Sequence, residues 1–192
     1  MTIVATAAGV FSGFLPQITG RLGPVRRFEA AAGQGVDRGF AVFHLGAPGG
    51  EVGTAVTDGL RFQRLNTLYP LELCCTLLTE DEETAHRIVL RVGRMMIDGR
   101  ATAGVGTLIV GDRPLHPDHA MVGVVCAGHP FTDADFDLVR DRDGRVRVQI
   151  LTLIPATEAE LALAADQGVE VLFEHWHGLA ADLADLARPS AV

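Results

Sequence analysis

The chain has 192 residues, 48% of them apolar, which fits one folded domain with a substantial core and excludes a disordered chain. Its formal net charge of −8 argues against nucleic acid as the main partner, because binding to phosphates requires clustered cations. All 16 cationic residues are arginine, which excludes chemistry that needs a lysine, such as Schiff-base formation or a Walker-type phosphate loop.

The N-terminal part is predicted to contain a tail, a short helix and two strands. Residues 1–16 are rich in small residues and lack a basic start, so we expect a weakly ordered tail rather than a signal peptide. The short helix should follow and break at Gly23-Pro24. Strands are expected over residues 40–46 and 54–57, where β-branched and aromatic residues lie near glycines.

The middle of the chain is predicted to alternate strands with one amphipathic helix. Residues 71–78 alternate as in a mostly buried strand, and apolar residues at helical spacing predict a helix over 81–98. Short strands are expected within 105–111 and over 121–127. A hairpin should then turn at Asp143-Gly144, and Pro155 is expected to end its long second arm.

Two helices are predicted at the C-terminus. Thr157 and Glu160 have the spacing of a capping box, in which each side chain accepts a hydrogen bond from the other residue's backbone N–H. Gly168 should end this helix, and a second apolar stripe follows that includes Trp176. Mostly antiparallel strands followed by two helices favour an α+β fold, with a mixed, mainly antiparallel sheet and helices packed against it. We expect a single domain over 17–186 and a tail over 187–192.

No candidate cofactor or metal site emerges from the motifs. His116 and His119, and likewise His175 and His177, lack the further ligands that a zinc site needs. The aspartates after Thr132 resemble the start of a calcium loop, but leucine and glycine stand where glycine and glutamate are required. We therefore expect no cofactor and no metal.

The cysteines indicate the compartment. Cys74, Cys75 and Cys126 are odd in number, and two of them are adjacent, which disfavours disulfides and predicts a reducing, cytoplasmic location. No run of about 18 apolar residues occurs, so we expect no transmembrane helix and no membrane partner.

The C-terminal part has a specific pattern: a strand that contains Leu-Ile-Pro, then Thr-Glu-Ala-Glu, a helix, a glycine and a leucine-rich ending. An earlier strand reads Tyr-Pro-Leu-Glu-Leu. These positions are Tyr69, Pro70, Leu71, Glu72, Leu73, Leu153, Ile154, Pro155, Ala156, Thr157, Glu158, Ala159, Glu160, Gly168, Leu172 and Phe173. The pattern resembles that of the Suppressor of fused (Sufu) domain family, and this chain is similar to a divergent bacterial member. The resemblance covers roughly residues 17–180, but the segment around Val56–Phe62 departs from the family pattern.

The resemblance implies a small mixed α/β domain that binds a protein. Animal members grip a short peptide as an added strand, and bacterial members are often immunity proteins that neutralise a toxin. An acidic protein suits a cationic toxin, because complementary fields speed association. The densest acidic patch, which we predict as the partner-binding residues, comprises Asp133, Asp135, Asp137, Asp141 and Asp143.

Two other classes of function remain open at the level of sequence. One is a small hydrolase-type enzyme that uses His116 or His119 with an aspartate. The other is a structural or homo-oligomeric accessory protein. The sequence also leaves open whether the protein forms a homodimer. An enzyme would require a histidine and an acid that meet in a cleft.

Overall fold

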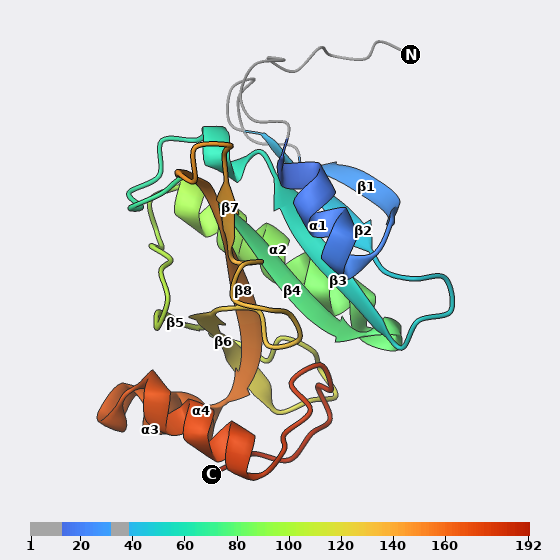
Figure 1. The fold of residues 1–192 in the computed structure, drawn as a ribbon. Helices are drawn as coiled ribbons and strands as arrows, with labels where there is room; N and C mark the ends of the chain where they lie inside the picture. Colours follow the sequence, from blue (N-terminus) through green and yellow to red (C-terminus); the bar gives the residue numbers. More distant parts are fainter. Residues whose placement is uncertain (1–12, 32–38) are drawn as a thin grey trace.

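The computed structural model describes residues 13–31 and 39–192 (Figure 1). Within these residues, eight strands form one sheet in the order β1-β2-β3-β4-β8-β6-β5, with β7 also paired to β8. The β4–β8 pair is parallel and the other pairs are antiparallel, which confirms the predicted mixed, mainly antiparallel α+β fold. The elements are α1 (Phe14–Leu22), β1 (Val25–Ala31), β2 (Phe40–Leu45), β3 (Val52–Asp58), η1 (Leu60–Phe62), β4 (Leu71–Leu78), η2 (Thr79–Asp81), α2 (Glu82–Ile97), β5 (Leu108–Val110), β6 (Met121–Ala127), β7 (Leu138–Arg140), β8 (Val146–Thr157), α3 (Glu158–Gln167) and α4 (Val169–Gly178).

Helix α2 covers one face of the sheet. Its apolar residues recur at helical spacing and pack on buried side chains of β2, β3 and β4. Gly93 allows a close approach to β2, because a Cβ at this position would lie 2.8 Å from Cζ of Phe40. The helix begins one residue after and ends one residue before the predicted span of 81–98.

Helix α1 covers part of the opposite face. Phe14 and Ile18 are buried there against side chains of β2, β3 and β8. The side chain of Cys74 also points into this layer, whereas that of Cys75 lies under α2. All three cysteines are free and buried, and burial raises the pKa of Cys74 and of Cys126 to about 12. These thiols are therefore protonated at neutral pH and are poor nucleophiles.

Helices α3 and α4 lie at the far end of the sheet, against β6 and the C-terminal half of β8 (Figure 1). The prediction that Pro155 ends its strand is wrong, because β8 continues to Thr157 and Pro155 pairs with Val124 of β6. The pairing of β8 with β4 stops at Thr152, so among the described strands Pro155 has a partner strand, β6, on one side only, and a strand tolerates proline at such a position.

The residues predicted as tails differ in their surroundings. Residues 1–12 lie outside the described part of the chain, while Phe14, within the predicted tail, is buried in α1. Residues 187–192 form no helix or strand, but Arg188 and Ala191 are buried against the domain. The part of the chain that the structure describes contains no helix both long and apolar enough to span a membrane.

Candidate functional site

An apolar pocket of about 450 Å³ opens beside α4, between this helix and the loop that follows β6. One aromatic residue of that loop, Phe131, is 50% exposed. A concave apolar surface with few polar groups is the usual form of a binding site. The side chains that line it include Ala127, Phe131, Ile154, Phe173, Trp176 and Leu183.

Trp176 supplies the buried part of this lining. Its indole N–H donates a hydrogen bond to Oε1 of Glu160 at 2.9 Å, which fixes the orientation of the ring. The ring of Phe173 lies next to it, with centroids 5.6 Å apart and planes tilted by 33°. The guanidinium of Arg188 lies 5.4 Å from the centroid of the Trp176 ring. The aromatic wall of the pocket is therefore held in place from behind.

The carboxylate of Glu160 is the centre of that support. It forms the predicted capping box with Thr157, and Arg188 donates to both of its oxygens, at 2.5 and 3.0 Å. Burial raises the pKa of Glu160, but the hydrogen bonds from Arg188, the Thr157 N–H and Trp176 outweigh it and hold the pKa at about 2. Glu160 is therefore ionised at neutral pH, and one charged pair anchors α3, α4 and the C-terminal segment together.

His129 anchors the opposite wall of the pocket. The Phe131 N–H donates to its Nδ1 at 3.3 Å, so the ring proton lies on Nε2, which meets the Thr76 hydroxyl at 2.9 Å. Thr76 in turn bonds the hydroxyl of Thr54 at 2.8 Å. Burial lowers the pKa of His129 to about 4, so the ring is neutral at physiological pH. This chain of contacts ties the Phe131 loop to the sheet.

Two of the five aspartates predicted to bind a partner accept hydrogen bonds from the local backbone. The Asp137 carboxylate accepts the His129 N–H at 2.9 Å and is half-buried, and burial raises its pKa. Asp141 accepts the N–H groups of Asp143 and Arg145, both at 3.0 Å, which stabilises the β7–β8 turn.

The other three aspartates are exposed. Asp133 lies 3.5 Å from the guanidinium of Arg21, and Asp133 and Asp135 belong to the same loop as Phe131. Asp143 lies on the β7–β8 turn. Asp133 and Asp135 are thus the exposed acids of the loop that also supplies a pocket wall.

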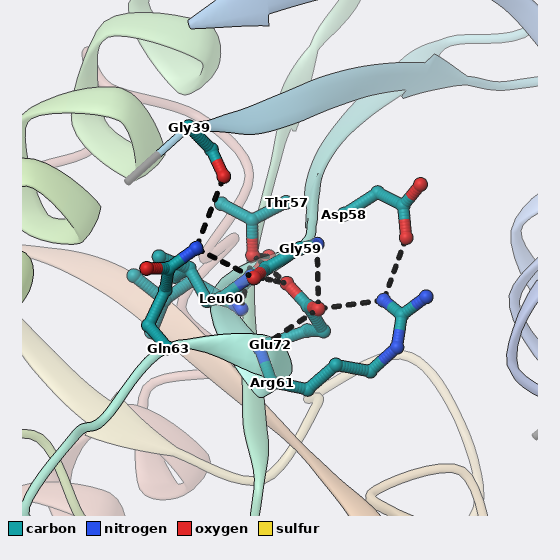
Figure 2. A network of polar contacts seen from close by, with 9 residues as sticks. Gly39, Thr57, Asp58, Gly59, Leu60, Arg61, Gln63 and Glu72 are labelled. Carbon is teal, nitrogen blue, oxygen red and sulfur yellow. Dashed lines mark hydrogen bonds and ion pairs between the residues drawn. The ribbon is translucent and has the colours of Figure 1, made fainter. Parts of the chain in front are cut away.

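Glu72, a buried acid near the start of β4, is the centre of a second polar network (Figure 2). Glu72 accepts from the hydroxyl of Thr57 at 2.6 Å, the N–H of Gly59 at 2.8 Å and the guanidinium of Arg61 at 2.6 Å. Burial raises its pKa, and these donors, with Arg61 first, act against that rise. The network closes the turn at η1, and Arg61 is stacked 4.5 Å from the ring centroid of Phe14. Its geometry is that of a structural ion pair.

The histidines of the hydrolase hypothesis lie in the loop before β6. His116 and His119 have ring centroids 4.8 Å apart, and the nearest acid to His116 is the exposed Asp118, at 3.9 Å. Neither histidine lines the pocket beside α4. His175 is bound through Nδ1 to the carbonyl of Ala191 at 3.1 Å, and His177 lies at the pocket.

One group of potential metal ligands lies away from the pocket, where β1, β2 and α2 meet. Glu29, His44 and His86 each place a donor atom within 4.8 Å of the others. The sequence motifs give no sign of this group, because 42 residues separate the two histidines and only the pairing of strand with helix joins them. The pocket could not be predicted from the sequence for the same reason, because a loop, a strand and a helix that are distant along the chain form its walls.

Comparisons with known proteins agree with the resemblance seen in the sequence. The family model described as Suppressor of fused protein (SUFU) matches residues 54–189. The chain matches none of the curated proteins with which it was compared.

Solved structures share the fold at low sequence identity. A SUFU homologue from Neisseria gonorrhoeae has a TM-score of 0.71 at 15% identity, over 94% of this chain and 95% of that one. A Sufu–Fu complex has a TM-score of 0.63 at 13% identity, over 93% and 89% of the two chains. Drosophila Suppressor of Fused has a TM-score of 0.58 at 11% identity, and the match covers 82% of this chain but 44% of that longer protein.

Proposed function

This chain belongs to the Suppressor of fused (SUFU) family, and from that premise we propose that it is a non-enzymatic domain that binds and sequesters a protein partner. The pocket beside α4 carries the proposal. It is open, apolar and about 450 Å³ in volume, and an exposed aromatic side chain, Phe131, stands at its edge. A buried aromatic or aliphatic anchor from a partner is the group that such a pocket receives.

The charges of the loop that carries Phe131, and of the whole chain, indicate the chemistry of the partner. Asp133 and Asp135 are exposed on the loop that carries Phe131, and the whole chain has a net charge of −8. Complementary charge speeds association and selects against wrong partners. We therefore expect the partner to present an apolar side chain next to arginine or lysine residues.

Within this class we propose an immunity protein that neutralises a cationic toxin in the cytoplasm. The net charge suits a cationic toxin, the buried free thiols suit a reducing compartment, and the resemblance is to a family whose bacterial members are often immunity proteins. One structural relative is a Sufu–Fu complex, so the fold occurs in a protein that holds a protein partner. A second copy of this chain is the alternative occupant of the pocket.

The experiment starts from the products of the open reading frames beside this gene. Each is purified and titrated against this protein by calorimetry, and the toxicity of any binder is measured in cells with and without this protein. Saturable binding that relieves toxicity is expected. If no neighbouring product binds or is toxic, the immunity role is wrong, and light scattering of the protein alone then shows whether it forms a homodimer.

A matched pair of variants tests the pocket itself. Phe131→Ala should weaken binding by about 2 kcal/mol, roughly 30-fold in Kd, as for a residue at the centre of an interface. Phe62 is equally exposed, at 50%, but lies on η1 away from the pocket, so Phe62→Ala should leave the Kd unchanged. Equal effects of the two substitutions would show that the partner binds elsewhere.

A further inference from the structure

A buried pair of histidines lies outside the pocket, at the edge of the sheet near the start of α2. His44 of β2 is 0% exposed and His86 of α2 is 8% exposed. Nε2 of His44 lies 3.0 Å from Nδ1 of His86, and the two rings are stacked with planes 11° apart. Glu29 of β1 completes the group, with one oxygen 3.9 Å from His44 and the other 3.7 Å from His86.

The register of the sheet brings these three residues together. Arg27 pairs with His44 and Glu29 pairs with Val42, so Glu29 and His44 point to the same face, the one that α2 covers. Glu82 and His86 are four residues apart on α2 and therefore share one side of the helix. Strand β1 pairs only with β2 among the described strands, so this group joins an edge strand to the helix.

A further carboxylate orients His44. Oε1 of Glu82 lies 2.9 Å from Nδ1 of His44, and a carboxylate can only accept, so Nδ1 carries the proton and Nε2 presents its lone pair to His86 and Glu29. Glu82 is held in turn by Arg26, at 2.5 Å from its other oxygen. A carboxylate that holds one nitrogen of an imidazole, so that the other nitrogen offers a lone pair, is the usual arrangement behind a metal-binding histidine. A bound ion would replace the present contact between Nε2 of His44 and Nδ1 of His86.

We propose that Glu29, His44 and His86 bind a divalent transition-metal ion, for which Zn²⁺ is the best match, with Glu82 as a positioning residue. Two imidazoles and one carboxylate suit zinc and its neighbours, whereas calcium and magnesium prefer oxygen ligands alone. Three protein ligands leave a further position for water. Bound metal would fasten the edge strand β1 to α2.

Arg27 is the competitor for this site. Its Nη1 lies 3.4 Å from Glu29, and its guanidinium also pairs with Glu83, so Arg27 keeps a partner when Glu29 turns toward the ion. The side chain of Glu29 is 48% exposed and has room to make that movement.

The test is a calorimetric titration of the full chain, without a histidine tag, with Zn²⁺. One ion per chain should bind, and zinc should raise the Tm of the wild-type protein because it binds the folded state. Glu82→Gln should weaken zinc affinity ~10–100-fold, as expected for loss of a carboxylate behind a ligand. His86→Gln should abolish both the binding and the rise in Tm.

Two further variants keep the outcome decisive. Glu29→Gln changes a half-exposed side chain and tests the site even if His86→Gln fails to fold; it should weaken zinc binding at least ~10-fold. His116→Gln combined with His119→Gln removes the other adjacent histidine pair, whose ring centroids are 4.8 Å apart, and should leave the affinity unchanged. No saturable zinc binding, or loss of binding only in the His116/His119 variant, would overturn the proposal.

Discussion

The indole of Trp176 donates a hydrogen bond to the Glu160 carboxylate at 2.9 Å, so a side chain of the pocket wall is fixed by the residue that caps α3. The same carboxylate oxygen accepts from Arg188 at 2.5 Å, and Arg188 also donates to the carbonyl of Pro155 at 3.0 Å. One buried charge therefore connects helix α3, helix α4, strand β8 and the C-terminal segment. The stability of the pocket and that of the C-terminus should depend on each other.

Replacement of Arg188 should test this connection. Arg188→Met leaves the Glu160 charge buried without its cationic partner, and such a loss destabilises a protein by about 3–5 kcal/mol. Urea denaturation measures the free energy of unfolding. Arg142→Met, at an exposed arginine on the β7–β8 turn, is the control and should change it by less than about 0.5 kcal/mol. Similar small losses in both variants would mean that the Glu160 pair is not an anchor.

Of the contacts that Glu160 makes, the capping box with Thr157 could be predicted from the sequence, whereas the ion pair with Arg188 could not. Thr157 and Glu160 are three residues apart, and the local geometry of a helix start fixes how they bond, so their spacing predicts the contact correctly. Arg188 is 28 residues away, and only the packing of the C-terminal segment brings it to Glu160. The expectation of a tail over 187–192 follows from composition, which carries no information on such a contact.

The Glu72 network predicts a contrast between two acids that share one arginine. Arg61 lies 2.6 Å from both Glu72, which is fully buried, and Asp58, whose side chain is 30% exposed. Glu72→Gln should cost about 3–5 kcal/mol of unfolding free energy, because Arg61 and several N–H donors lose a buried anion. Asp58→Asn should cost less, about 1 kcal/mol, because the Asp58 carboxylate is partly solvated and Arg61 keeps Glu72 as its partner. Equal losses would contradict the structural role of Glu72.

Glycine substitutions should have opposite signs on the two faces of the sheet. Gly93→Ala would place a Cβ 2.8 Å from the buried ring of Phe40, and overpacking of this kind costs about 1–3 kcal/mol. This loss should exceed the gain of about 1 kcal/mol in helix propensity. Gly20→Ala in α1 meets no atom within 4 Å and should stabilise the protein by up to about 1 kcal/mol. Thermal unfolding of both variants measures the two signs, and stabilisation by Gly93→Ala would show that Phe40 moves freely.

Elements whose contacts are local along the chain could be predicted from the sequence, whereas contacts made through tertiary packing could not. Periodicity predicts α2 and the hairpin at Asp143-Gly144 because their contacts are local. Pro155 does not end β8, because a strand tolerates a proline wherever the missing N–H leaves no hydrogen-bond acceptor without a donor. Whether an acceptor is left so depends on the neighbouring strand, which the local sequence does not identify. His44 and His86 meet only through the packing of β2 against α2, so no spacing along the chain could indicate them.

His129 should make the stability of the protein depend on pH. Burial lowers its pKa to about 4, whereas in the unfolded chain the pKa is about 6.5. At pH 7 both states are neutral. As the pH falls from 6.5 toward 4, the unfolded chain binds a proton that the folded protein excludes, so the free energy of unfolding decreases with falling pH. At about 1.4 kcal/mol per unit of pH, this residue alone should remove about 2 kcal/mol between pH 7 and pH 5.

His129→Gln isolates this contribution. Glutamine does not titrate, so the variant should lose about 2 kcal/mol less than the wild type between pH 7 and pH 5, even though its stability at pH 7 is lower. Urea denaturation at both pH values gives the difference. His177→Gln, at an exposed histidine on α4, is the control and should keep the wild-type dependence on pH. If His129→Gln keeps the wild-type dependence on pH, protonation of His129 does not loosen the loop that carries Phe131. The hydrogen bond between Nε2 of neutral His129 and Thr76 is then not what holds this wall of the pocket.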